Sequence, residues 1–171
     1  NVNSLAMPKS LIIICVFSLL VSCNTTTYYV VRHAEKSENT MTSDVPLSDA
    51  GQQRAEALRE KLKNKGINTI YTTRYLRTKS TAKPLADAVG ITMQEYDPRD
   101  TTFSTRLLSA GTEDRGNTLI VGHSNTVDDI VNKLSGKTLI PGDLPETQYG
   151  DLFILKKKGK KIIFRQEKFG L

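Results

Sequence analysis

Short apolar blocks alternate along this chain with longer stretches that have helical spacing. The runs YYVV at 28–31 and TLIV at 118–121 have the pattern of strands buried on both faces of a sheet. Two shorter β-prone segments, at 68–73 and 91–96, predict further strands. We expect a closing hairpin around Gly159, with strands at 152–155 and 162–164.

Helical periodicity fills the intervals between these strands. Ser48 is a suitable N-cap for a helix to about residue 64, in which Ala55, Leu58 and Leu62 share one face. Further helices are predicted at 75–89, with a kink or restart at Pro84, at 101–110, and from a cap at Ser124 to about Ser135. Strands alternating with helices predict an α/β fold, with three α/β/α layers and a largely parallel sheet.

The 171 residues show no internal repeat or linker, so we expect a single domain over residues 28–171. The net charge of +6 owes much to the lysine-rich run at 156–161. This run falls on the predicted hairpin turn and contains no aromatic side chain on which bases could stack, so no nucleic-acid partner is expected. Contact of these lysines with anionic lipid headgroups is a secondary hypothesis.

The first residues resemble a bacterial lipoprotein signal peptide. We expect Met7 to be the true start and residues 1–22 to be removed, because Lys9 precedes an apolar run at 11–21. This run ends in Leu-Val-Ser-Cys, which resembles a lipobox, so Cys23 is expected to carry lipid. A plain secretory signal or an uncleaved anchor remains the alternative.

Cys15 and Cys23 are the two cysteines of the sequence, so the predicted mature domain would contain no thiol beyond the lipidated one. Cysteine nucleophiles and cysteine-based zinc sites are therefore excluded. Residues 23–27 would form a lipidated cysteine and a short tether of about 15 Å. We expect an exported lipoprotein that is anchored to the membrane and faces the periplasm.

The two histidines of the chain stand at equivalent positions. His33 follows the strand at 28–31, and His123 follows the strand at 118–121, where ligands bind in open α/β sheets. Arg32 precedes His33, and Arg77 follows the next strand along the chain. Guanidinium groups disfavour a divalent cation but suit a phosphoryl group, which a neutral imidazole can attack as a nucleophile.

Four segments then resemble, in the right order, the histidine phosphatase superfamily, which includes the cofactor-dependent phosphoglycerate mutases. They are RHAEK at 32–36, PLSDAGQQRA at 46–55, IYTTRYLRTKSTA at 70–82 and VGHS at 121–124. The resemblance covers nearly all of residues 28–155 and implies a phosphoglycerate mutase-like fold. It also implies an enzyme that needs no cofactor and no metal.

The resemblance assigns roles to individual residues. His33 would be the nucleophile that takes the phosphoryl group, while Arg32, Arg77 and His123 would form the pocket that binds it. Asn39 stands where mutase-like members have an asparagine that contacts the phosphate.

The sequence departs from the family pattern in two ways. Ala34 replaces the glycine that many members have after the first histidine, and the acid that protonates the leaving group is not fixed. Glu95, Asp97 and Asp100 are candidates for that acid, and we favour Asp97 because it lies just past a strand end. An ordinary acidic turn is the alternative.

Three functions follow from these residues. The first is a metal-independent phosphatase that acts on a phosphomonoester or a similar phosphoryl group, like the small phosphohistidine phosphatase branch in size. The second is a mutase-like phosphotransferase, disfavoured because the long insertions of mutases are missing. The third is a lipid-anchored phosphate-binding protein with little catalysis. We expect a monomer, and the sequence does not name the substrate.

Overall fold

The computed structural model describes residues 25–38, 44–109 and 116–170. The predicted signal peptide, Cys23 and Asn39 lie outside these residues. Within the described ranges, no helix is long and apolar enough to cross a membrane.

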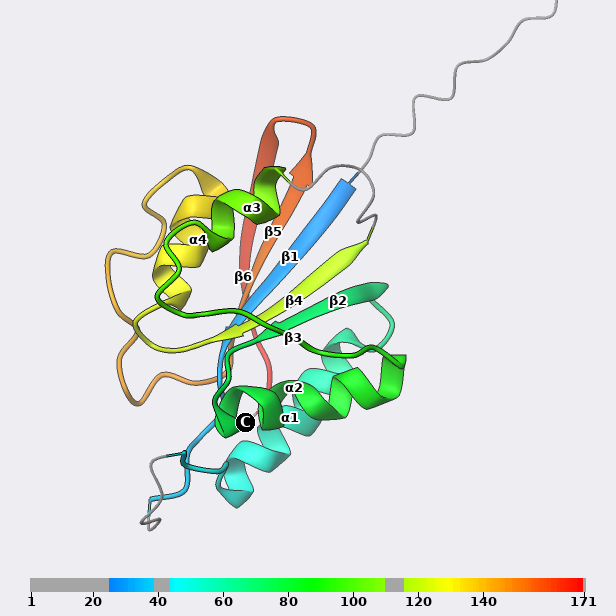
Figure 1. Ribbon diagram of the computed structural model, residues 1–171, viewed down its shortest axis with the longest axis vertical. Coiled ribbons are helices and arrows are strands. Elements are labelled where there is room, and N and C mark those ends of the chain that lie inside the picture. Colours follow the sequence, from blue (N-terminus) through cyan, green and yellow to red (C-terminus); the bar gives the residue numbers. More distant parts are fainter. Residues whose placement is uncertain (1–24, 39–43, 110–115, 171) are drawn as a thin grey trace, which may run out of the picture.

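The centre of the fold is a mixed sheet, in which the described residues form six strands in the order β3-β2-β4-β1-β5-β6 (Figure 1). The first four are mutually parallel, whereas β5 and β6 form an antiparallel hairpin at one edge. The prediction of a largely parallel sheet is confirmed. The strand bounds are β1 Thr25–Arg32, β2 Ile67–Thr72, β3 Gln94–Glu95, β4 Asn117–Gly122, β5 Asp151–Lys158 and β6 Lys161–Lys168.

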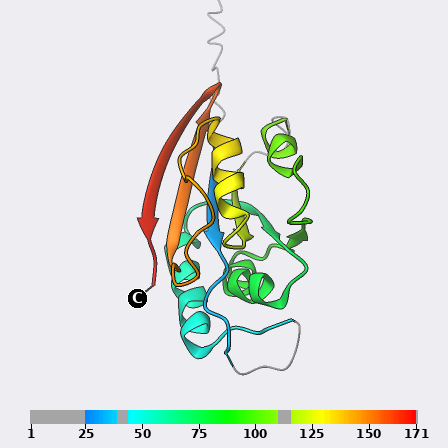
Figure 2. The ribbon, with the colours of Figure 1, turned by 90° about the vertical axis from the view of Figure 1, so that its left-hand side faces the viewer.

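Four helices of the described chain cover the two faces of the sheet: α1 Asp49–Leu62, α2 Leu76–Val89, α3 Phe103–Ser109 and α4 Val127–Ser135. Alternate residues of each strand point to opposite faces. Val30 and Ile120 therefore pack with the apolar side chains of α3 and α4, while Val31 and Val121 pack with those of α1 and α2. Figure 2 shows α4 against the sheet. The predicted three-layer α/β/α architecture is confirmed.

Tertiary contacts move several predicted boundaries. Strand β1 begins at Thr25, inside the expected tether, because residues 25–27 pair with Lys156–Lys158 of β5. Those lysines extend β5, so the hairpin turn is reduced to residues 159–160. The third strand is only Gln94–Glu95, because it pairs with just the last two residues of β2.

Two predictions about helix ends and interruptions need correction. Helix α2 runs without a break through Pro84, so it does not restart there. Ser124 is not the cap of α4, whose N-cap residue is Thr126. By contrast, Ser48 caps α1 as predicted, because its side chain accepts a hydrogen bond from the backbone N–H of Gly51.

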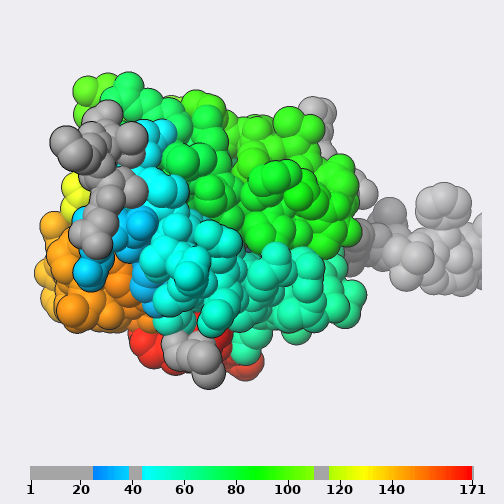
Figure 3. All heavy atoms as spheres, turned by 90° about the horizontal axis from the view of Figure 1, so that it is seen from below, coloured from blue at the N-terminus to red at the C-terminus, as the bar shows by residue number. Residues whose placement is uncertain are grey.

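The carboxyl ends of β1 and β4 lie side by side, since Arg32 is in register with Gly122 and the His33 N–H donates to the Gly122 carbonyl at 2.9 Å. Both histidines therefore follow neighbouring strands at the same end of the sheet, where the parallel strands have their carboxyl ends. Figure 3 shows this side of the molecule, where the chain after β1 lies beside the loop before β5.

Candidate active site

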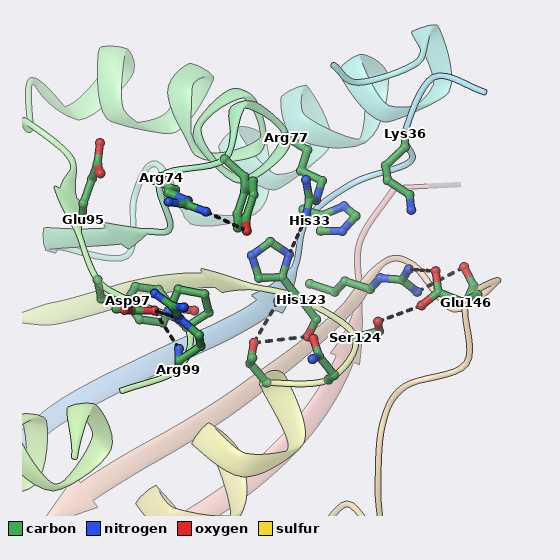
Figure 4. A pocket seen from close by; sticks show the side chains of 16 residues that line it. His33, Lys36, Arg74, Arg77, Glu95, Asp97, Arg99, His123, Ser124 and Glu146 are labelled. Atoms are coloured by element: carbon green, nitrogen blue, oxygen red, sulfur yellow. Dashed lines mark hydrogen bonds and ion pairs between the residues drawn. The ribbon is translucent and has the colours of Figure 1, made fainter. Parts of the chain in front are cut away.

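A pocket of about 570 Å³ opens at the carboxyl ends of the parallel strands (Figure 4). Four residues singled out from the sequence line it: Arg32, His33, Arg77 and His123. They come from the ends of β1 and β4 and from the first turn of α2. The parallel sheet thus brings together residues that are up to 91 positions apart in the chain.

His33 is buried and has a fixed tautomer. Its Nδ1 lies 2.8 Å from the carbonyl oxygen of Ala34, which can only accept, so Nδ1 carries the proton and Nε2 keeps its lone pair. Burial lowers the pKa of His33 to about 3, and the positive charges of Arg32 and Arg77 act in the same direction. The ring is therefore neutral at physiological pH and can act as a nucleophile through Nε2.

His123 has the opposite tautomer. Its Nδ1 accepts from the guanidinium of Arg77 at 3.3 Å, so Nε2 carries the proton and donates to the Thr73 hydroxyl at 3.0 Å. Burial, followed by the charges of Arg77 and Arg32, lowers the pKa of His123 to about 4. The two imidazole rings meet edge to face, with centroids 5.5 Å apart.

Two arginines in the pocket wall each keep one donor without a partner. Nε of Arg32 and Nε of Arg77 are buried, and neither has a hydrogen-bond partner among the described residues. A buried N–H without a partner costs free energy, and a guanidinium N–H most of all. An anion in this pocket would lie in the field of both guanidinium groups, because both arginines line it. Phosphoryl oxygens fit this donor set.

A second layer of contacts fixes the backbone around His33. The carboxylate of Glu35 accepts from Nε of Arg54 at 2.9 Å and from its Nη2 at 2.6 Å. Helix α1 approaches so closely that a Cβ at Gly51 would overlap the carbonyl oxygen of Glu35. The residue that replaces the family glycine, Ala34, is accommodated because its methyl group packs in a small apolar cluster.

The three acidic candidates are not equivalent. Asp97 lines the pocket, but Arg99 holds its carboxylate and lowers its pKa by side-chain and backbone hydrogen bonds. Glu95 also lines the pocket and forms an ion pair with Lys79. Asp100 accepts a hydrogen bond from the Thr102 hydroxyl and is not part of the pocket wall. The role of Asp97 as proton donor stays a prediction, because the residue would first have to leave Arg99.

The loop before β5 supplies residues that the sequence did not reveal. Glu146 accepts from Arg32 at 2.7 Å and from the Ser124 hydroxyl at 2.7 Å, and the ring of Tyr149 lies 4.3 Å beneath the Arg32 guanidinium. The sequence of this loop has no periodicity or motif that identifies these residues as part of the pocket. Only the proximity of Arg32 in the folded chain does so.

Asn39, the other predicted phosphate contact, lies outside the described residues. Within the described ranges, no group of three or more histidine, cysteine, aspartate or glutamate side chains could hold a metal ion. The pocket wall places the cationic side chains of Arg32 and Arg77 around the neutral imidazole of His33.

Part of the chain is similar in sequence to known proteins. The profile of the Histidine phosphatase superfamily (branch 1) matches residues 28–99. A probable phosphoglycerate mutase GpmB of Yersinia pestis (strain Pestoides F) is 40% identical over 76 residues, which cover 42% of this chain. The matched segment spans only about a third of that relative, 35% of its length.

Solved structures share the fold. The protein histidine phosphatase SixA complexed with tungstate has a TM-score of 0.66 at 17% identity, over 83% of this chain and 96% of its own. The putative phosphohistidine phosphatase SixA of Agrobacterium tumefaciens has a TM-score of 0.62 at 20% identity, over 85% and 96%. The first part of the chain is therefore similar in sequence to the histidine phosphatase superfamily, and the whole described fold is similar to that of the SixA structures.

Proposed function

We propose that this chain is a metal-independent phosphatase that hydrolyses a phosphomonoester or a similar phosphoryl group through a phosphohistidine on His33. One observation carries the proposal: a neutral imidazole with a free Nε2 lies beside two arginines whose buried Nε–H groups lack partners. This is the arrangement that nucleophilic attack on a bound phosphoryl group requires.

In the first half-reaction, the lone pair on Nε2 of His33 attacks phosphorus. The new P–N bond forms as the bond to the leaving oxygen breaks, and that oxygen departs with the electron pair and takes up a proton. Arg32 and Arg77 hold the oxygens whose charge changes in this step. Asp97 is the proposed proton donor.

In the second half-reaction, water attacks the phosphorus of the phosphohistidine and gives a proton to the carboxylate of Asp97, which restores the acid. The P–N bond breaks, its electron pair returns to Nε2 of His33, and inorganic phosphate leaves. The Ala34 carbonyl holds Nδ1–H throughout, so the ring is restored in the same tautomer. The open pocket, with many polar side chains in its wall, is consistent with access for that water.

The partial similarity to GpmB keeps a mutase-like phosphotransferase as the alternative. A mutase would pass the phosphoryl group from His33 to a second hydroxyl rather than to water. The names of the SixA neighbours favour a labile phosphoryl donor, and we extend that substrate class to this chain as part of the proposal.

Hydrolysis of para-nitrophenyl phosphate tests this function. Wild type and His33→Ala are compared in EDTA, with the folded state of both checked by thermal melting. We expect turnover in the wild type, loss in the variant, and acid-labile phosphate on His33 after quenching. Equal turnover in both proteins would exclude His33 as the nucleophile. An added alcohol that captures all of the phosphate would favour the transferase.

We also propose that lipid on Cys23 anchors the domain at a membrane on the periplasmic side. The support is the resemblance of residues 7–23 to a lipoprotein signal. The shortened link between Cys23 and β1, which begins at Thr25, would hold the sheet close to that membrane.

A further inference from the structure

The contacts of the Arg32 guanidinium are divided between its nitrogens. Its Nη1 donates to three backbone carbonyls of the loop before β5, those of Pro145, Glu146 and Gln148, at 2.8, 3.1 and 3.3 Å. These bonds anchor one edge of the group to the protein. The edge that remains consists of Nε and Nη2, and such an edge can hold two oxygens of one anion side by side.

The two nitrogens of this remaining edge differ. Nε has no partner among the described residues, whereas Nη2 donates to Oε2 of Glu146 at 2.7 Å and, over a longer 3.4 Å, to the Tyr149 hydroxyl. The other carboxylate oxygen of Glu146 accepts from the hydroxyl of Ser124, directly after His123, at 2.7 Å. An internal anion therefore occupies one of the two positions that a phosphoryl group needs on Arg32.

The carboxylate can leave at low cost. The side chain of Glu146 is 69% exposed, while that of Arg32 is 3% exposed, so a swing of the Glu146 carboxylate into solvent breaks few contacts. The backbone carbonyls that anchor Nη1 do not depend on that swing. Ser124 first, and then the charge of Arg32, hold the pKa of Glu146 below its usual value, so the competitor is an anion at physiological pH.

We propose that Glu146 is an affinity-determining residue that competes with the phosphoryl group for Nη2 of Arg32. Each binding event exchanges the carboxylate for a phosphoryl oxygen, and each release of inorganic phosphate is assisted by its return. The inference rests on the proposed function, because it assigns to Arg32 the role of phosphate holder. Figure 4 shows Glu146 and Ser124 at the end of the pocket opposite Asp97 and Arg99.

Binding of inorganic phosphate to the full chain, measured by calorimetry, tests the competition. Glu146→Gln and Glu146→Ala are compared with wild type and with Glu95→Gln, a matched loss of one carboxylate in the same pocket wall that is paired with Lys79 instead. We expect both Glu146 variants to bind phosphate at least about fivefold more tightly, the equivalent of about 1 kcal/mol. Glu95→Gln should change the affinity by less than about twofold, because its charge acts only through solvent.

Each other outcome overturns the inference. Equal tightening in the Glu95 and Glu146 variants would mean a general effect of pocket charge. Weaker binding in the Glu146 variants would mean that Glu146 positions Arg32 for phosphate. If the wild type binds phosphate and the Glu146 variants match it, only the competition fails. If no protein binds phosphate, the proposed function fails as well.

Discussion

Nδ1 of His33 lies 2.8 Å from the carbonyl oxygen of its own neighbour, Ala34. Because a carbonyl cannot donate, this contact fixes the proton on Nδ1 and exposes the lone pair on Nε2. A backbone group thus does what a carboxylate does for the histidine of a serine protease triad. The contact needs no side chain at position 34, so alanine serves there as well as glycine would.

The neutral state of the histidines predicts how stability depends on pH. The pKa of His33 falls from 6.5 to about 3 on folding, so below pH 6.5 the unfolded chain binds more protons than the folded one. The free energy of unfolding should therefore decrease as the pH drops, by about 2 kcal/mol for His33 between pH 6.5 and 4.5. Chemical denaturation across this range measures it.

His33→Asn is the control for that experiment, since asparagine can still donate to Ala34 but does not titrate. Carboxyl groups whose pKa is lowered in the folded protein, such as Glu35, also reduce the free energy of unfolding on acidification, but mainly below pH 4.5. Wild-type and variant curves that ran parallel from pH 6.5 to 4.5 would show that His33 is not held neutral by the fold.

Arg77 should not be replaceable by lysine. The ammonium group of lysine has a single nitrogen and no planar pair of donors. It cannot hold two phosphoryl oxygens and also donate to Nδ1 of His123. We expect Arg77→Lys to lower kcat/KM for para-nitrophenyl phosphate by about 10²-fold or more. Arg74→Lys, an exposed neighbour in the same pocket wall, should stay within about threefold. Similar losses in both variants would mean that Arg77 contributes only net charge.

The prediction for Asp97 depends on the leaving group. Asp97→Asn should lower kcat by about 10²-fold on an alkyl phosphate, whose leaving oxygen needs a proton. It should have little effect on para-nitrophenyl phosphate, because nitrophenolate leaves unprotonated. A bound phosphoryl group nearby would raise the pKa of Asp97 and weaken its pairing with Arg99. If both substrates respond alike, Asp97 only holds Arg99.

The approach of α1 to the segment after His33 predicts a stability effect. Gly51→Ala should destabilise the fold by about 1–3 kcal/mol, because the new methyl group meets the backbone of Glu35 rather than a movable side chain. Activity should fall with it, since the same segment carries His33. Gly142→Ala, where a Cβ meets nothing within 4 Å, is the matched control and should be neutral. A stable Gly51→Ala protein would show that α1 can shift freely.

The lipid anchor makes a prediction for living cells. Expressed in a bacterial host, the wild type should label with radioactive palmitate and sediment with membranes, whereas Cys23→Ala should do neither. Cys15→Ala is the control, because its cysteine lies within the predicted removed segment. Membrane association that persists without label would instead favour an uncleaved N-terminal anchor.

Periodicity and spacing were enough to identify the fold class and the two histidines that the fold brings into one pocket. Strands buried on both faces require continuous apolar runs, and the residues that end those runs must meet at one edge of a parallel sheet. For this reason His33, His123 and Arg32 could be found without coordinates. The same logic could not fix β3, because two residues of pairing leave almost no pattern in the sequence.

Alternation and burial are local properties of the chain, so the residues that meet at the strand ends can be read from the sequence. The side chains that contact those residues from distant loops depend on how the whole chain folds. Glu146 lies 114 positions after Arg32, in a loop without periodicity. Its contact with Nη2 of Arg32 depends on the pairing of β5 with β1, which places the loop before β5 beside the end of β1. The tautomers of the histidines are likewise set by neighbours in space, since only an acceptor or donor at hydrogen-bond distance determines which nitrogen keeps the proton.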